Sequence, residues 1–245
     1  MFVNAVEIAT KAAFPIFRNQ QLPGNQQSWM VAGAGFFISP QGHFASVAHL
    51  FDSAGPGVKF LYLGQVPETV VNPPIKIQEI ARDDDRDVYI GKIDITPAAY
   101  FSLSLEDAPL GRSVCIVGYP LAQLAPNADG GLEVGGARRY IQPSFVLDHG
   151  ISRAISDSGR TREHHGFLVR DVGLFGMSGG PVFDINGIVL GIQGSVTPPR
   201  ISEGGGRKIT VENAQAIKSS IIIELARDNN VPVQVVEPPA QAIES

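Results

Sequence analysis

One serine lies in a run of glycines. Residues 176–181 read Gly-Met-Ser-Gly-Gly-Pro, so the hydroxyl of Ser178 is uncrowded and the backbone around it is free to bend. The N–H groups of Gly176 and Ser178 can then point at one spot, as an oxyanion hole requires. A serine hydroxyl is a weak nucleophile until a base takes its proton, so this chemistry also needs a histidine and an acid elsewhere in the chain.

The order of these groups along the chain separates the serine-hydrolase folds. Residues 176–180 fit the Gly-x-Ser-x-Gly pattern of α/β-hydrolases, but that fold needs a helix directly after the serine and a later histidine. The chain after Ser178 instead predicts a strand, an Asn186-Gly187 turn and another strand. The subtilisin order, acid before histidine, fails for His49 because no aspartate precedes Asp52. The order His, Asp, Ser of chymotrypsin remains. All five histidines precede the serine: His43, His49, His149, His164 and His165.

His49 is the candidate base. It ends a segment that predicts two strands joined by a turn at residues 40–42, the second strand running to His49. His43 lies beside that turn, so we expect it to be a solvated residue at a strand start. Taken alone, His49 would be a half-buried structural histidine, and the presence of Ser178 favours the base.

Asp87 is the candidate acid. It is the last acidic residue before the apolar strand expected at residues 88–93, where a carboxylate can bond an imidazole and hold its tautomer. Asp83, Asp84 and Asp85 are expected to be solvated turn residues, with Asp85 the alternative acid. An ordinary strand-capping aspartate is the structural alternative for Asp87.

Three ordered motifs together resemble the trypsin-like serine peptidases, and among them the bacterial HtrA/Deg-type protease domain most. The similarity spans residues 29–218. It rests on Gly-Ala-Gly-Phe at 33–36 with Ala48-His49, on Asp87-Val88 and on residues 176–181, with support from residues 114–120 and 186–192.

This resemblance implies an all-β fold of two six-stranded antiparallel β-barrels, a chymotrypsin-like double barrel with the active site between them and a C-terminal helix after them. It also implies a serine endopeptidase in which His49 activates Ser178 to form an acyl-enzyme and Asp87 orients His49. Met177 stands where zymogen-type members carry an acid, so activation by N-terminal cleavage is not expected. No PDZ-like domain follows in the sequence.

The resemblance also suggests a specificity pocket. Its wall would be Gly194, Ser195 and Val196, and its base would lie near Val172. A pocket narrowed by valine and without charge favours a small aliphatic side chain before the scissile bond. Alternatively, both valines belong to the core and residues 198–206 set the pocket.

Composition limits the other classes of function. The 245 residues carry a net charge of −5 and no basic tract, so nucleic acid is a poor partner. The single Cys115 lies in an apolar stretch, forms no internal disulfide, and reads as a buried structural thiol in a reducing compartment or a bacterial protein. No signal peptide or membrane span is recognised. A cytoplasmic location is expected, or a periplasmic one if a leader was removed.

The chain divides into three parts. Residues 1–28 form a lead segment with a helix that ends near Pro15. Residues 29–229 form the protease domain, and residues 230–245 form a partly ordered tail. The protease domain comprises a first barrel at 29–105, a second at 106–212 and a helix at 213–229, with loops expected at 125–136, 152–165 and 198–206.

We expect a protein or peptide substrate, no cofactor and no metal, because His164 and His165 lack an acid or cysteine at a suitable spacing. A homo-oligomer or a regulatory partner protein remains open. The rival functions are a protease-fold binding or regulatory module with a silent active site, and an esterase.

Overall fold

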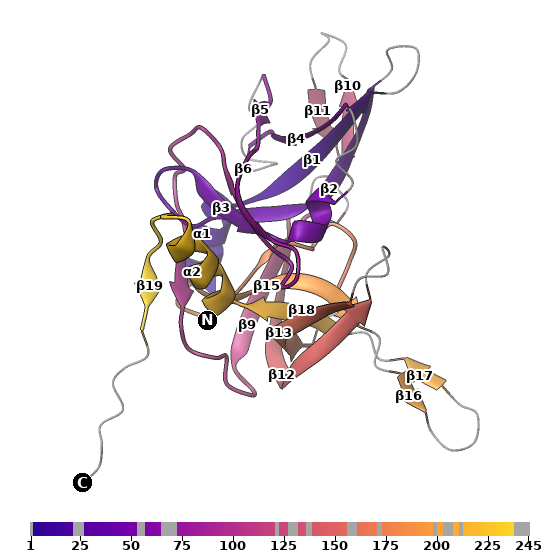
Figure 1. The fold of residues 1–245 in the computed structure, drawn as a ribbon, viewed down its shortest axis with the longest axis vertical. Helices are drawn as coiled ribbons and strands as arrows, with labels where there is room; N and C mark the ends of the chain where they lie inside the picture. Colours follow the sequence, from indigo (N-terminus) through magenta and orange to yellow (C-terminus); the bar gives the residue numbers. More distant parts are fainter. Residues whose placement is uncertain are drawn as a thin grey trace.

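The computed structural model describes most of the chain. The described residues are 2–21, 27–52, 57–64, 73–120, 123–126, 132–135, 139–155, 161–170, 173–197, 200–202, 208–210 and 213–237. They form two large β-sheets, two short ribbons and two helices, one near each end of the chain (Figure 1). The all-β double-barrel fold expected from the sequence is confirmed.

The first sheet has seven antiparallel strands in the order β5-β4-β1-β2-β3-β7-β6. Six strands were expected here, and the additional one is β1, which pairs with both β2 and β4. The strands are β1 (Ala13–Gln21), β2 (Gln27–Phe37), β3 (His43–Ser46), β4 (Val58–Tyr62), β5 (Ile75–Lys76), β6 (Gln78–Asp83) and β7 (Val88–Lys92).

The second sheet closes into a barrel of six strands, as expected. It runs β14-β9-β12-β13-β18-β15, and β15 pairs back with β14. Two further strands extend it in parallel, β8 on β15 and β19 on β8. The strands are β8 (Ser102–Ser104), β9 (Ser113–Gly118), β12 (Tyr140–Ile155), β13 (Thr161–Val169), β14 (Pro181–Phe183), β15 (Ile188–Thr197), β18 (Asn213–Lys218) and β19 (Val235–Val236).

Three segments expected as loops contain strands. In the first, β10 (Gln123–Pro126) pairs with β11 (Leu132–Gly135). In the second, the hairpin of β12 and β13 extends to Ile155 and Thr161. In the third, β16 (Arg200–Ser202) lies within the expected loop and pairs with β17 (Lys208–Thr210), which lies beyond its end.

The chain ends also differ from the expectation. Helix α1 (Val3–Ala12) stops before Pro15, and β1 continues the chain into the first sheet, which therefore begins at Ala13 rather than at residue 29. The helix expected at residues 213–229 is the strand β18 followed by helix α2 (Ser219–Asp228). Ala214 and Ala216 face the second-barrel core while Ile217 faces the opposite side, which is the two-residue period of a strand.

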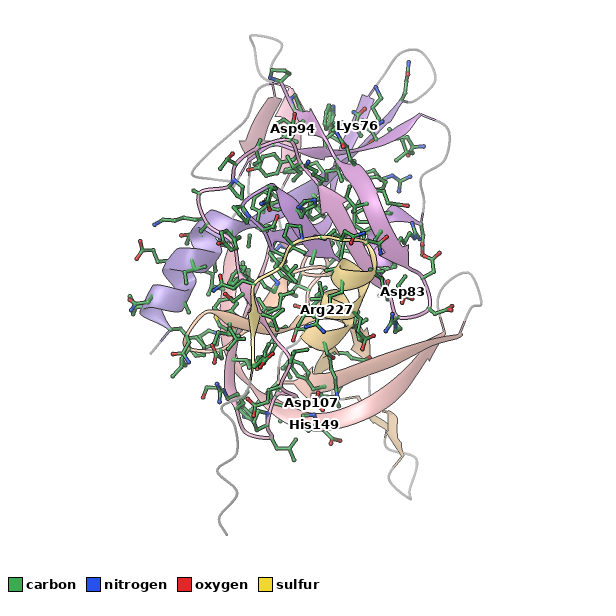
Figure 2. The ribbon with its side chains drawn as sticks, turned by 60° about the vertical axis from the view of Figure 1, so that its left-hand side comes forward. Lys76, Asp83, Asp94, Asp107, His149 and Arg227 are labelled. Carbon is green, nitrogen blue, oxygen red and sulfur yellow. The ribbon has the colours of Figure 1, made fainter. Side chains whose placement is uncertain are left out.

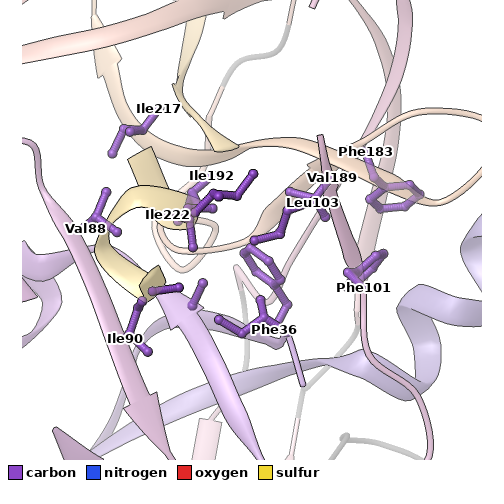
Figure 3. Packing of buried hydrophobic residues seen from close by; sticks show 14 of the residues in the cluster. Phe36, Val88, Ile90, Phe101, Leu103, Phe183, Val189, Ile192, Ile217 and Ile222 are labelled. Atoms are coloured by element: carbon purple, nitrogen blue, oxygen red, sulfur yellow. The ribbon is translucent and has the colours of Figure 1, made fainter. Parts of the chain in front are cut away.

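A single apolar cluster joins the two sheets. It brings Phe36 and Ile90 of the first sheet against Leu103 and Ile192 of the second, with Ile222 of α2 packed on both (Figure 3). Burial of this kind contributes on the order of 25 cal/mol per Å² of apolar surface. The two sheets are therefore held together by one core. Charged side chains such as Lys76, Asp107 and Arg227 are exposed on the outside (Figure 2).

Candidate active site

His49 lies in a short 3₁₀ turn rather than at a strand end. Strand β3 stops at Ser46, and the turn η2 (Ala48–Phe51) carries the imidazole. Its side chain is 32% exposed, so one side of the ring faces solvent. The strand expected to reach His49 therefore ends three residues early, which leaves the ring free to face Asp87.

Asp87 contacts His49 at two points. Its Oδ2 lies 2.8 Å from His49 Nδ1, and its Oδ1 accepts a hydrogen bond of 2.8 Å from the backbone N–H of His49. Asp87 is only 1% exposed. A carboxylate at Nδ1 selects the tautomer that carries its proton there, which leaves Nε2 as the acceptor of the neutral ring.

The neighbouring acids have other surroundings, and Asp83 is the last residue of strand β6 rather than the solvated turn residue expected. Asp85 is exposed. Asp83 accepts bonds from the backbone N–H and the guanidinium of Arg86, and Asp84 pairs with Arg82 at 2.6 Å. Among these aspartates, the contacts to His49 are made by Asp87.

Ser178 lies in the loop before β14 and is tied to the first sheet through its backbone. Its carbonyl oxygen accepts a 2.8 Å hydrogen bond from the N–H of Ala34 on β2. A Cβ atom on Gly33 would lie 2.6 Å from that oxygen and 2.5 Å from the side chain of Leu50. Gly33 therefore lies between the backbone of Ser178 and the side chain of Leu50, which follows His49 in the chain. The absence of a side chain at Gly33 lets the serine and histidine segments lie close together.

Three of the backbone N–H groups around Ser178 donate hydrogen bonds. The N–H of Met177 donates to Leu174 at 3.0 Å, that of Gly179 to Gln193 at 2.8 Å, and that of Gly180 to Met177 at 3.0 Å. Within the described part of the chain, the N–H groups of Gly176 and Ser178 donate no hydrogen bond. These are the two groups expected to form an oxyanion hole.

The turn that carries Gly176 needs glycine. Gly176 has φ +93°, and a Cβ there would lie 2.6 Å from the carbonyl oxygen of Tyr119. The bond from Met177 back to Leu174 closes a four-residue turn, and a turn with positive φ at its third position favours glycine. The glycine at residue 176 is therefore the residue type that this backbone conformation requires.

The residues expected to line a specificity pocket are only partly described. Gly194, Ser195 and Val196 lie together on β15, whereas Val172 is outside the described residues. Gly194 is buried, and a Cβ on it would approach Ile217 to 3.1 Å.

Gln193 is a residue that the sequence analysis missed. Its backbone bonds to Gly179 and Gly180, and its side chain is buried with no partner for Oε1 in the described chain. The available signal was a polar residue directly after the apolar run of residues 188–192.

Two residues near the loop are plainly structural. Met177 is fully buried and lies against Gly118. A Cβ on Gly118 would lie 2.6 Å from the Cα of Met177. Burial raises the pKa of the Cys115 thiol to about 12, which keeps it protonated, as a structural thiol would be.

The described residues offer no metal site and no membrane-spanning helix. There, no three side chains of histidine, cysteine, aspartate or glutamate gather to hold a metal ion. Neither of the two described helices is long and apolar enough to cross a membrane.

Comparisons with known proteins agree with this geometry. The family model of the trypsin-like peptidase domain matches residues 33–192, more than half of the chain. A protein of Halomonas elongata named "Probable periplasmic serine endoprotease DegP-like" is 26% identical over 179 residues, covering 71% of this chain and 31% of its own length. The chain thus spans about a third of the length of that curated relative.

Solved structures share the fold. The Rv3671c protease from M. tuberculosis in its active form superposes with a TM-score of 0.64 at 19% identity, covering 95% of this chain and 86% of that one. The HtrA-type protease AlgW with a decapeptide gives 0.67 at 13% identity, covering 94% and 67%. With the family model matched across both barrels, this chain belongs to the trypsin-like peptidase domain family.

Proposed function

We propose that this chain is an active serine endopeptidase with Ser178 as nucleophile, His49 as base and Asp87 as the acid that orients the base. The observation that carries the proposal is the pair of 2.8 Å contacts from the Asp87 carboxylate to His49. A buried carboxylate with both oxygens on one histidine fixes the direction and the tautomer of the ring.

The chemistry proceeds in two halves. His49 Nε2 takes the proton of the Ser178 hydroxyl while Oγ attacks the peptide carbonyl, and the oxyanion is held by the N–H groups of Gly176 and Ser178. His49 then gives its proton to the departing amine, which leaves an acyl-enzyme. A water molecule repeats both steps, with His49 again taking and returning a proton, and releases the acid and the free serine.

The substrates are proteins or peptides. For the residue before the scissile bond we propose a small aliphatic side chain, held by the β15 wall at Gly194, Ser195 and Val196 with Val172 near the pocket base. Valine supplies no charge to a lysine or arginine, and burying an unpaired cation costs several kcal/mol. A peptide library that varies this residue tests the preference, and dominant cleavage after lysine or arginine contradicts it.

The setting of the enzyme is a separate proposal. The relative from Halomonas elongata is named as periplasmic, which supports the periplasmic alternative for this chain over the cytoplasmic one. Homo-oligomerisation and a regulatory partner remain predictions, and size-exclusion chromatography with light scattering tests the first.

Covalent labelling with a fluorophosphonate tests the nucleophile. Wild type is expected to be labelled and Ser178→Ala to remain unlabelled, because the reagent needs an activated hydroxyl. Ser113→Ala removes an exposed serine at the start of β9 and is the matched control, expected to label fully. Circular dichroism verifies that each variant is folded. An unlabelled wild type favours a silent module, and a labelled Ser178→Ala moves the nucleophile elsewhere.

A further inference from the structure

Tyr119 connects the loop of Ser178 to the N-terminal segment. It follows β9 and is fully buried. Its backbone N–H donates to the carbonyl oxygen of Gly176 at 3.1 Å, and its hydroxyl donates to the carbonyl oxygen of Ala13 at 2.8 Å. One residue therefore joins the turn that carries Gly176, through its backbone, to the junction between α1 and β1, through its side chain.

The contact with Gly176 fixes one peptide plane. The carbonyl oxygen of Gly176 is bonded to Tyr119, while the N–H of Met177 in the same plane is bonded to Leu174 at 3.0 Å. The carbonyl oxygen of Tyr119 also lies 2.6 Å from where a Cβ on Gly176 would stand. This peptide plane is held at both ends. The N–H of Gly176, in the peptide plane before it, donates no hydrogen bond to any described residue, as an oxyanion donor requires.

The other end of Tyr119 is held by the N-terminal segment and by Arg139. Arg139 Nε donates to the Tyr119 hydroxyl at 3.2 Å, and its Nη2 donates to the carbonyl oxygen of Thr10 at 3.0 Å. The guanidinium lies 5.8 Å from the centre of the Tyr119 ring. The hydroxyl thus accepts from Arg139 and donates to Ala13, so both of its hydrogen-bonding roles are used.

Helix α1 is packed on the second barrel independently of these bonds. Ala5 and Ala9 are fully buried, and a Cβ on Gly187 would lie 2.9 Å from the side chain of Ile8. Phe2 packs edge-on against Phe183 at 6.5 Å. The helix therefore supplies a fixed base for the acceptor at Ala13.

We infer that Tyr119 is a positioning residue for the oxyanion hole, and that through it the hole depends on the docking of residues 10–13. The inference rests on the proposed function of Gly176. Stabilisation by an oxyanion hole requires donors that are held in place before the reaction, and displacements well below 1 Å already reduce the rate. Met177 carries no charge that could hold this loop by an ion pair. We therefore assign the holding of the loop to the contact between Tyr119 and Gly176.

Tyr119→Phe is the central test, with Tyr140→Phe as matched control. The Tyr140 hydroxyl bonds to Gln142, two residues further along β12, and within the described part of the chain it makes no hydrogen bond to the turn or to α1. We expect Tyr119→Phe to lower kcat by about tenfold with KM changed less than twofold, and to slow fluorophosphonate labelling by the same factor. The low-field NMR signal of the His49 Nδ1 proton should not move, because Asp87 is untouched. Tyr140→Phe should match wild type.

Hydrogen exchange separates this inference from the proposed function. By mass spectrometry, Tyr119→Phe should accelerate amide exchange in residues 173–180, whether or not the enzyme turns over substrate. Arg139→Gln keeps the tyrosine hydroxyl and its bond to Ala13, so it should give a smaller effect in the same direction. Unchanged exchange and unchanged kcat in Tyr119→Phe would overturn the inference. So would a kcat loss accompanied by loss of the His49 signal, since that indicates general disruption. If Tyr119→Phe accelerates amide exchange but the wild-type protein is not labelled by fluorophosphonate, the positioning contact is supported and only the proposed function is rejected.

Discussion

The carboxylate of Asp87 bonds to His49 through both oxygens, one to the ring at Nδ1 and one to the backbone N–H, each at 2.8 Å. The same residue adopts φ +59°, a left-handed conformation that aspartate tolerates better than most side chains. Its own carbonyl accepts the N–H of Ala48 at 3.3 Å. The acid thus fixes both the ring and the turn that carries it.

Asp87→Asn is expected to lower kcat by about 10⁴-fold near neutral pH. The amide can present a donor toward Nδ1, which favours the tautomer that cannot accept the serine proton. Steady-state kinetics on a peptide substrate measure the effect. Asp85→Asn changes an exposed residue and should keep wild-type turnover. The opposite pattern would assign the acid to Asp85.

The sequence could indicate the groups that we propose to carry the chemistry because each stands in a local pattern. Ser178 is flanked by glycines, His49 follows a turn between apolar segments, and Asp87 precedes an apolar strand. The expected double barrel was implied by the resemblance to trypsin-like peptidases that these ordered motifs carry. Contacts between these segments are made by residues far apart in sequence, such as the bond from Ala34 to Ser178.

The supporting residues could not be found in the same way. Residues 213–229 carry apolar side chains at helical spacing, but Ala214 and Ala216 are small enough to pair closely with β13. At Gly166 a Cβ would come within 2.0 Å of the Ala216 carbonyl, so this pairing depends on a distant glycine. The role inferred for Tyr119 likewise depends on its contacts with Ala13 and Gly176, and neither residue is near it in sequence.

Met177 should accept an apolar replacement and reject a charged one. It is fully buried in the core of the second barrel, with Gly118 against it. Met177→Leu is expected to change the free energy of unfolding by less than about 1.5 kcal/mol. Met177→Asp buries an unpaired charge and should destabilise by several kcal/mol. Urea unfolding measures both. A Met177→Asp variant of wild-type stability would mean that this position has a cationic partner.

Mass spectrometry of the active enzyme provides a related check. The absence of an acid at residue 177 predicts that activity does not require a new N-terminus within the chain. Purified full-length protein should therefore turn over substrate without prior cleavage. An inert full-length chain that becomes active only after cleavage would contradict this prediction.

His43 should make stability depend on pH below neutrality. Burial, and then the nearby charge of Lys92, lower the pKa of His43 below its usual 6.5, and its Nδ1 lies 2.9 Å from the Ser39 hydroxyl. The folded state therefore favours the neutral ring. As pH falls below 6.5 the unfolded chain takes up the proton first, so stability decreases from there toward the lower folded pKa.

Urea unfolding at pH 7.5 and at pH 5.0 measures this contribution. The loss of stability between the two should be smaller in His43→Gln than in wild type. His149→Gln, which changes an exposed histidine on β12, serves as the control and should lose as much as wild type. Equal losses in wild type and His43→Gln would show that His43 does not titrate differently on folding.

Alanine substitutions at two glycines with positive φ distinguish the effect of backbone strain from a role in catalysis. Gly176 has φ +93° and Gly111 has φ +75°, but a Cβ on Gly176 meets the Tyr119 carbonyl at 2.6 Å whereas one on Gly111 meets nothing within 4 Å. Gly111→Ala should therefore cost only the left-handed strain, about 1 kcal/mol of unfolding free energy, and keep full turnover. Gly176→Ala adds a displacement of the turn and should lower kcat by roughly 10²–10³-fold, the range for loss of one oxyanion donor. Unfolding curves and kinetics on the two variants give the comparison. If Gly176→Ala loses stability but retains turnover, the Gly176 N–H does not hold the oxyanion.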